Sequence, residues 1–205
     1  MRHPAPYADK LLPLLGALLA GCDAVLDPFA GTGKLRKVCP QATLVEIEPE
    51  WAVMGGALVG DALALPFEDD LFDAICTSPT YGNRMADQYV DEGVRHTYRY
   101  ALGRPLDAGS SGRLQWGEAY RAFHCRAWAE AWRVLRPGGR LILNISDHIR
   151  GGQRQPVSAW HRQTLEEMGF VHVETHTVQT PRQRHGANGQ ARVAGELVMV
   201  FEKPR

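Results

Sequence analysis

The chain has 205 residues, enough for one domain with a sizeable hydrophobic core. Its 23 basic and 23 acidic residues give zero formal net charge, which excludes an overall positive field, so nucleic acid could be held only by local patches. The four cysteines are scattered without a CxxC pair, which argues against a zinc site and against a secreted disulfide framework, and we expect no metal.

The first predicted helix covers residues 7–20 and ends at Gly21. Its apolar stretch is interrupted by Pro13 and is too short to cross a bilayer. Asp9 and Lys10 stand where the apolar segment of a signal peptide would begin. We therefore expect a cytoplasmic protein that does not interact with a membrane.

Short apolar runs alternate with helical patterns along the rest of the chain. The predicted strands cover residues 24–26, 42–45, 57–59, 73–77, 140–145, 171–174 and 196–201. The predicted helices cover residues 34–38, 118–135 and 156–168, with a turn at 136–139. Residues 82–116 are expected to form a long inserted loop, and residues 177–194 a basic loop. This alternation predicts a parallel-rich α/β sheet, whose ligands sit at the C-terminal ends of the strands.

A glycine turn, residues 27–33 with the sequence DPFAGTG, follows the first predicted strand. Its two glycines allow the backbone to approach a ligand closely. A dinucleotide fingerprint needs a third glycine where this chain has Arg36, which argues against a dehydrogenase. Glu46 ends the second strand at the spacing of an acidic residue that binds both ribose hydroxyls, and Glu48 is the nearby alternative.

Further candidate cofactor contacts follow the second and third strands. Asp61 could accept a hydrogen bond from the N6 amine of adenine, or it could cap a turn. Ile47 and Phe67 are candidate apolar walls for an adenine ring, with a plain core role as the alternative for each, whereas Trp51 is expected to be a core residue.

The segment Thr77-Ser78-Pro79-Thr80-Tyr81-Gly82 follows the apolar run 72–76. The Ser78 hydroxyl and the Pro79 carbonyl can both accept hydrogen bonds from one amino group, and Tyr81 can stack on the ring that carries it. This pattern suits an exocyclic amine of a nucleobase. Together with the glycine turn, it predicts transfer of a methyl group from S-adenosylmethionine (SAM) to a base amine.

The order DPFAGTG, VEIEPE, GDALALPF and TSPTYG resembles class I SAM-dependent methyltransferases, and more narrowly those that modify exocyclic amines of nucleobases. The catalytic motif of that group is Asp, Asn or Ser followed by Pro-Pro-Tyr or Pro-Pro-Phe, and its Ser form after Thr is most familiar in DNA N4-cytosine methyltransferases. Residues 3–7 resemble the N-terminal segment that closes over the methionine end of SAM. Thr80 replaces the second proline, which leaves the turn looser, and no target-recognition domain of ordinary size is visible.

The resemblance covers roughly residues 3–147 and implies a Rossmann-like α/β fold with a mostly parallel seven-stranded sheet and an antiparallel last strand. We expect residues 1–205 to form a single domain, and the helices after the first two strands to be shorter than is usual in that family. It implies that Asp27 contacts the amino group of SAM, that residues 30–33 wrap the methionine and that Glu46 holds the ribose. The predicted catalytic residues are Ser78, Pro79 and Tyr81. The predicted cofactor contacts are Tyr7, Asp27, Phe29, Ala30, Gly31, Gly33, Glu46, Ile47, Asp61, Ala62 and Ser78.

Two basic segments supply candidate contacts to nucleic acid, with a solvated surface loop as the alternative for each. These contacts are Arg84, Arg95, Arg99, Arg182, Arg184 and Arg192. The leading hypothesis is a DNA amino-methyltransferase, with N4 of cytosine ahead of N6 of adenine. The alternatives are an RNA base-amine methyltransferase, a non-catalytic SAM-fold subunit that helps a partner bind nucleic acid, and a small-molecule amine methyltransferase.

Overall fold

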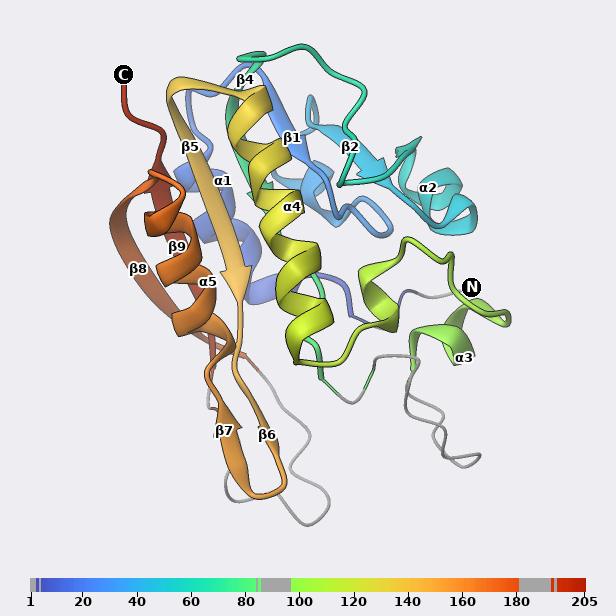
Figure 1. Ribbon diagram of the computed structural model, residues 1–205. Coiled ribbons are helices and arrows are strands. Elements are labelled where there is room, and N and C mark those ends of the chain that lie inside the picture. Colours follow the sequence, from blue (N-terminus) through green and yellow to red (C-terminus); the bar gives the residue numbers. More distant parts are fainter. Residues whose placement is uncertain (1–2, 4, 84, 86–96, 181–192, 194) are drawn as a thin grey trace.

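The computed structural model describes residues 3, 5–83, 85, 97–180, 193 and 195–205 (Figure 1). Within these residues, seven strands form one sheet in the order β3-β2-β1-β4-β5-β9-β8. The strands are β1 Val25–Asp27, β2 Thr43–Glu46, β3 Leu58–Val59, β4 Phe72–Thr77, β5 Leu135–Ile145, β8 Val171–Gln179 and β9 Gly195–Glu202. β9, the last strand of the chain, runs antiparallel to the other six strands of the described sheet, and the predicted sheet is confirmed.

Helices cover both faces of the sheet. They are η1 Asp9–Leu11, α1 Leu12–Leu18, η2 Lys34–Lys37, α2 Pro49–Gly55, α3 Tyr98–Leu102, η3 Ser111–Arg113, α4 Glu118–Val134 and α5 Val157–Glu167. Successive side chains of a strand point to opposite faces. On β5, Leu141 and Leu143 accordingly pack into the core beneath α4 and α5, whereas Ile142 packs into the core beneath α1. The helical segments after β1 and β2 are short, as expected.

The first helix is shorter than predicted. A 3-10 turn begins at Asp9 and the α-helix at Leu12, so Tyr7 precedes both. Pro13 lies in the first turn of α1, where its missing N–H has no carbonyl to bond and its fixed φ suits the start of a helix. The proline therefore marks the beginning of the α-helix rather than an interruption of it.

The turn predicted at residues 136–139 lies inside β5, which begins at Leu135. Phe72 pairs with Leu135 and Ala74 with Arg140, so β5 has more residues than β4 between these two pairs. The extra residues bulge out of the ladder, with Gly138 at a positive φ of 78°. The turn residues therefore form a bulge that interrupts one strand.

A hairpin that was not predicted follows the end of β5. The strands β6 His148–Arg150 and β7 Gln153–Gln155 pair antiparallel around Gly151 and Gly152, and the hairpin projects beyond the sheet (Figure 1). Two adjacent glycines between short polar runs are a hairpin signal. The inserted segment also contains structure, namely α3 and η3. In the described part of the chain, no helix combines the length and hydropathy that a bilayer crossing requires.

Candidate functional site

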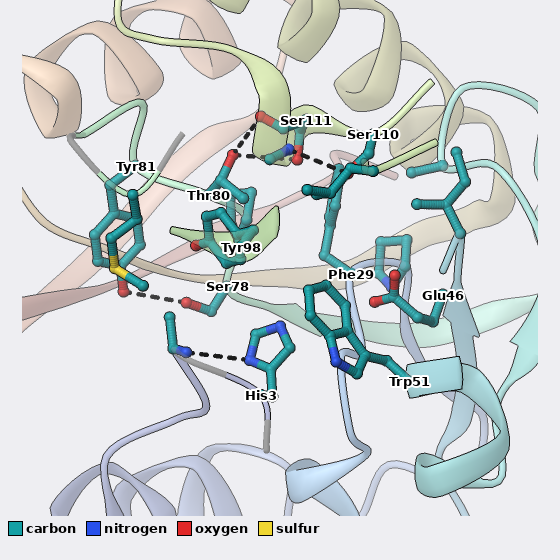
Figure 2. Close-up of a pocket in the computed structure, with 18 of the residues that line it drawn as sticks. His3, Phe29, Glu46, Trp51, Ser78, Thr80, Tyr81, Tyr98, Ser110 and Ser111 are labelled. Carbon is teal, nitrogen blue, oxygen red and sulfur yellow. Dashed lines mark hydrogen bonds between the residues drawn. The ribbon is translucent and has the colours of Figure 1, made fainter. Parts of the chain in front are cut away.

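A cavity of about 430 Å³ lies where the C-terminal ends of β1, β2 and β4 meet. Residues before η1, residues 106–112 and the facing ends of β5 and β9 complete its wall. Figure 2 shows Glu46 and Trp51 toward one end, Tyr81 at the other, and Phe29 and Ser78 between them. We call these the cofactor end and the acceptor end.

Glu46 is the main polar group of the cofactor end. Its Oε2 accepts the Gly31 N–H at 2.8 Å and its Oε1 accepts the Glu48 N–H at 2.9 Å. Burial raises the pKa of Glu46, and the two backbone donors oppose that rise. Each carboxylate oxygen keeps a lone pair, so the pair of oxygens fits two ribose hydroxyls.

Glu48, the alternative ribose contact, is committed elsewhere. Its side chain is completely buried, and its carboxylate lies 3.0 Å from the Arg104 guanidinium and accepts the Asp107 N–H at 2.9 Å. It does not line the cavity, whereas Glu46 does. Glu48 therefore anchors the inserted segment to the end of β2.

The adenine contacts predicted from sequence fall into two groups. Ile47, Asp61 and Ala62 line the cavity, and Asp61 also accepts the backbone N–H of Leu63 at 2.9 Å, so it caps a turn as well. Phe67 takes the alternative role of a core residue, because its ring packs edge-on against Phe72, with centroids 5.0 Å apart, and does not line the cavity. Side chains alternate between the two faces of a sheet only within strands, so the sequence does not say on which side of the sheet the ring of a loop residue lies.

Asp27 lies beneath the cavity and is completely buried. Its carboxylate accepts the Phe29 N–H at 3.1 Å and the hydroxyls of Thr77 and Tyr7 at 2.7 and 3.3 Å. Burial raises the pKa of Asp27 to about 7. Tyr7 and Phe29 line the cavity above it.

The glycine turn is covered by the N-terminal segment. A methyl group added at Gly31 would lie 3.2 Å from His3 Nε2, and the His3 ring contacts Trp51 with centroids 4.4 Å apart. A methyl group added at Gly33 would lie 2.6 Å from the Gly55 carbonyl oxygen, so Gly33 permits close packing of the turn against α2. Ala30, Gly31 and Gly33 do not line the cavity, and their contact with SAM stays a prediction. Trp51 is buried as expected, but it also lines the cavity.

Ser78, Pro79, Thr80 and Tyr81 all line the acceptor end, and their contact with an acceptor stays a prediction. Thr80, which stands where the motif of the resembled family has its second proline, has partners of its own. Its hydroxyl lies 3.1 Å from both the carbonyl oxygen and the Oγ of Ser111, and donates to one of them (Figure 2). The threonine therefore ties the acceptor turn to the inserted segment.

A buried hydrogen-bond chain also holds this turn. Trp128 Nε1 donates to His161 Nδ1 at 3.0 Å, which leaves the proton of a neutral His161 on Nε2. That Nε2 donates to the Tyr120 hydroxyl at 2.9 Å, and the hydroxyl donates to the Thr80 carbonyl oxygen at 2.7 Å. Burial keeps the pKa of His161 well below its usual value, so the ring stays neutral. The chain fixes the acceptor turn to α4 and α5.

Sequence reasoning missed two polar residues of the acceptor end, Asn144 near the end of β5 and Glu196 near the start of β9. Asn144 Nδ2 lies 3.1 Å from Ser78 Oγ, 3.0 Å from Tyr81 Oη and 2.9 Å from Glu196 Oε2. Tyr81 Oη donates to the same Glu196 oxygen at 2.9 Å. The available signal was one polar residue inside each of two apolar strands, LILNI and ELVMVF.

Three buried polar atoms of cavity-lining residues have no hydrogen-bond partner among the described residues. They are Trp51 Nε1, Asn144 Oδ1 and Thr180 Oγ1. An unpaired buried polar atom costs about 1–3 kcal/mol, which a ligand that bonds to it can recover. All three atoms therefore suit a polar group of a bound molecule.

Of the predicted nucleic-acid contacts, the structure places Arg99 in α3, where it is exposed. The other five lie outside the described residues and stay predictions: Arg84, Arg95, Arg182, Arg184 and Arg192. Over the described ranges, no group of three or more His, Cys, Asp and Glu side chains is arranged to hold a metal ion.

No protein-family model and no curated protein matches this chain. Solved structures do match it over nearly its whole length. The putative methyltransferase in a complex with the Trm112 methyltransferase activator of Haloferax volcanii is 14% identical, with a TM-score of 0.61 over 96% of this chain and 89% of that chain. The N-methyltransferase NodS of Bradyrhizobium japonicum is 15% identical, with a TM-score of 0.59 over 96% of this chain and 94% of that chain.

A third match is the 1,6-didemethyltoxoflavin-N1-methyltransferase of Burkholderia thailandensis, solved with 1,6-didemethyltoxoflavin and S-adenosylhomocysteine bound. It is 18% identical, with a TM-score of 0.55 over 97% of this chain and 80% of that chain. At such identities the likeness shows the fold. The chain has the class I SAM-dependent methyltransferase fold, and none of the three matches is named as a DNA methyltransferase.

Proposed function

We propose that this protein binds SAM and transfers its methyl group to an exocyclic amine of a nucleobase in DNA, N4 of cytosine ahead of N6 of adenine. One observation carries the proposal: Ser78 and Pro79, at the end of β4, line the same cavity as Glu46, at the end of β2. Two hydrogen-bond acceptors for an amine therefore share one enclosed space with a carboxylate suited to a ribose.

At the cofactor end, the carboxylate of Glu46 accepts the two ribose hydroxyls, and its backbone partners keep it in place. Asp61 accepts from the adenine amine through the oxygen that does not cap the turn. Ile47 packs against the adenine ring. When bound, SAM supplies an electrophilic methyl group on its sulfonium.

At the acceptor end, Ser78 Oγ and the Pro79 carbonyl accept the two N–H groups of the amine. An exocyclic amine is a weak nucleophile, because its lone pair is delocalised into the ring. The two hydrogen bonds favour a pyramidal nitrogen whose lone pair points at the methyl group, and holding that geometry supplies much of the acceleration. A base in a duplex leaves the stack to enter the cavity, where Tyr81 receives it.

A small-molecule amine is the second candidate acceptor. The net charge is zero, and two proteins of the same fold are named for methylating nitrogen atoms, NodS and the didemethyltoxoflavin enzyme. A cavity of about 430 Å³ is within the size range of small-ligand sites.

Transfer of labelled methyl groups from SAM to unmethylated DNA, total RNA and small amines, followed by digestion and mass spectrometry, tests the proposal. Labelled N4-methylcytosine or N6-methyladenine is the expected product. A labelled RNA nucleoside or a labelled small amine would show that RNA or a small molecule, and not DNA, is the substrate. SAM binding without any product would support a non-catalytic subunit. The Ser78→Ala variant should lose transfer but keep its affinity for SAM in calorimetry. A parallel loss of both would mean that Ser78 does not belong to the acceptor end.

A further inference from the structure

The acceptor end contains a connected set of polar side chains that leads away from the reacting atoms. Ser78 Oγ lies 3.1 Å from Tyr81 Oη, and Tyr81 Oη lies 2.9 Å from Glu196 Oε2. Asn144 Nδ2 lies within 3.1 Å of all three oxygens. Ser78 is the member proposed to touch the acceptor amine, and Glu196 is the one farthest along the set.

The chemistry of the partners fixes the direction of these hydrogen bonds. A carboxylate oxygen only accepts, so the single proton of Tyr81 points to Glu196 and cannot serve Ser78. Ser78 therefore donates its own proton to Tyr81 Oη. The amide orientation of Asn144 is fixed in the same way, because only its NH₂ group can face the Glu196 oxygen.

Ser78 Oγ retains one site for the acceptor. A hydroxyl has one proton and two lone pairs. The proton goes to Tyr81 and one lone pair accepts from Asn144, which leaves the other lone pair for an N–H of the amine. The amine, Ser78, Tyr81 and Glu196 thus form a row in which every proton points toward the carboxylate.

We propose that Glu196 is the terminal proton acceptor of methyl transfer and receives the proton lost by the amine through the hydroxyls of Ser78 and Tyr81. This role rests on the proposed function, since it requires an amine acceptor. It does not depend on which amine is methylated. Glu196 acts through Tyr81 and is a positioning residue, as is Asn144, which holds the row together.

The step balances in atoms and charge. The amine nitrogen forms a bond to the methyl carbon, and the bond from that carbon to the sulfonium sulfur breaks, with its electron pair remaining on sulfur. The nitrogen releases a proton to Ser78 Oγ, Ser78 passes its own proton to Tyr81 Oη, and Tyr81 passes its own to Glu196 Oε2. The cationic charge that arrives with the methyl group therefore ends by neutralising a carboxylate at the far end of the row.

The fold accounts for the meeting of these residues. Ser78 and Tyr81 follow β4, Asn144 lies near the end of β5, and β9 runs antiparallel to β5, which places its start at the same edge of the sheet. Burial and the nearby charge of Glu196 raise the pKa of the Tyr81 phenol well above its usual value. The phenol therefore stays protonated and passes a proton on without ionising.

Single-turnover kinetics test the relay on the wild-type protein and on three variants of Glu196. Glu196→Gln should lower the transfer rate by roughly 10²–10⁴-fold, the range of general acid–base catalysis, with SAM affinity and acceptor KM unchanged. Glu196→Asp should retain part of the rate, and added formate should partly restore Glu196→Ala. The matched control is Glu202→Gln, on the same strand and away from the cavity, which should match the wild type. A Glu196→Gln rate within threefold of wild type, or a change in KM alone, would refute the relay.

A second measurement needs neither SAM nor an acceptor. Tyrosine labelled with ¹³C at Cζ reports ionisation by NMR, and Tyr81→Phe assigns the signal. The Tyr81 pKa should fall in Glu196→Gln and stay unchanged in Glu202→Gln, because only the first loses a charge bonded to the phenol. An unchanged Tyr81 titration in Glu196→Gln would overturn the relay. Wild-type protein that methylates no amine would instead refute the proposed function, so the two failures are distinguishable.

Discussion

Replacing Thr80 by valine removes one hydroxyl and keeps the size and branching of the side chain. That hydroxyl donates to a carbonyl or a hydroxyl of Ser111, a residue only 6% exposed. Leaving a buried acceptor without its partner costs about 1–3 kcal/mol. Because Thr80 itself is half-buried and its single proton serves one acceptor at a time, we expect about 1 kcal/mol, which lowers Tm by roughly 2–4 °C in a chain of this size.

Loss of the same hydrogen bond should also lower the affinity for SAM at the cofactor end of the cavity. Ser111 belongs to the segment that passes over Ile47, where a methyl group added at Gly109 would lie 3.0 Å from Ile47 Cδ1. If the lost bond loosens this segment only in the protein without SAM, binding of SAM must order the segment again. That ordering makes the binding free energy less favourable by up to about 1 kcal/mol, which weakens SAM affinity about fivefold. Thermal denaturation and calorimetry with SAM measure the two effects.

Thr43→Val is the matched control, since the Thr43 side chain on β2 is half-buried and has no hydrogen bond within the described residues. It should leave Tm and SAM affinity unchanged. Thr80→Pro introduces the second proline of the motif that this turn resembles but removes the same hydroxyl, so we expect no gain in activity. Wild-type stability in Thr80→Val, or higher activity in Thr80→Pro, would refute the structural role of this threonine.

Three further substitutions test the site. Glu46→Gln should weaken SAM binding by at least tenfold in calorimetry, because it replaces one charged acceptor with a donor; unchanged affinity would mean that Glu46 does not hold the ribose. Arg104→Ala should destabilise the protein by roughly 1–3 kcal/mol in urea unfolding, since it leaves the buried Glu48 carboxylate without its cationic partner, whereas Arg162→Ala breaks an exposed pair and should cost less than about 1 kcal/mol. Burial lowers the pKa of His124 from 6.5 to about 4, so its contribution to stability, at most about 3 kcal/mol, is present above pH 6.5 and is lost as the pH falls toward 4. His124→Gln should flatten this part of the stability profile, and an unchanged slope would contradict the buried neutral ring.

Much of the sheet could be predicted because its signals are local. Each strand core is a short apolar run bounded by polar or turn residues, and the polar residues Glu46, Asp61 and Ser78 follow such runs directly. In a parallel sheet these positions must meet at one edge, so the two ends of the cavity followed from chain order alone. Pro79 and Tyr81 were predicted together with Ser78, because all three belong to the segment TSPTYG.

The parts that were missed depend on contacts between distant segments. Glu196 reaches Tyr81 only because β9 pairs with β5 in the register that sets Leu197 beside Ile145, and no local pattern encodes that register. The role of Phe67 could not be decided from sequence, because nothing in the local pattern of a loop residue says whether its ring enters the core or lines the cavity. The bulge in β5 was read as a turn because Gly138 favours both.

Within the inserted segment, the part from Arg104 to Ser111 is attached to the rest of the protein at two points. Arg104 pairs with Glu50 on α2, and Ser111 accepts a hydrogen bond from Thr80 on the acceptor turn. A movement that lifts this segment breaks both contacts together. Under the proposed function, exchange of the spent cofactor and departure of the methylated product are therefore expected to share a single opening event, and one rate constant should govern both.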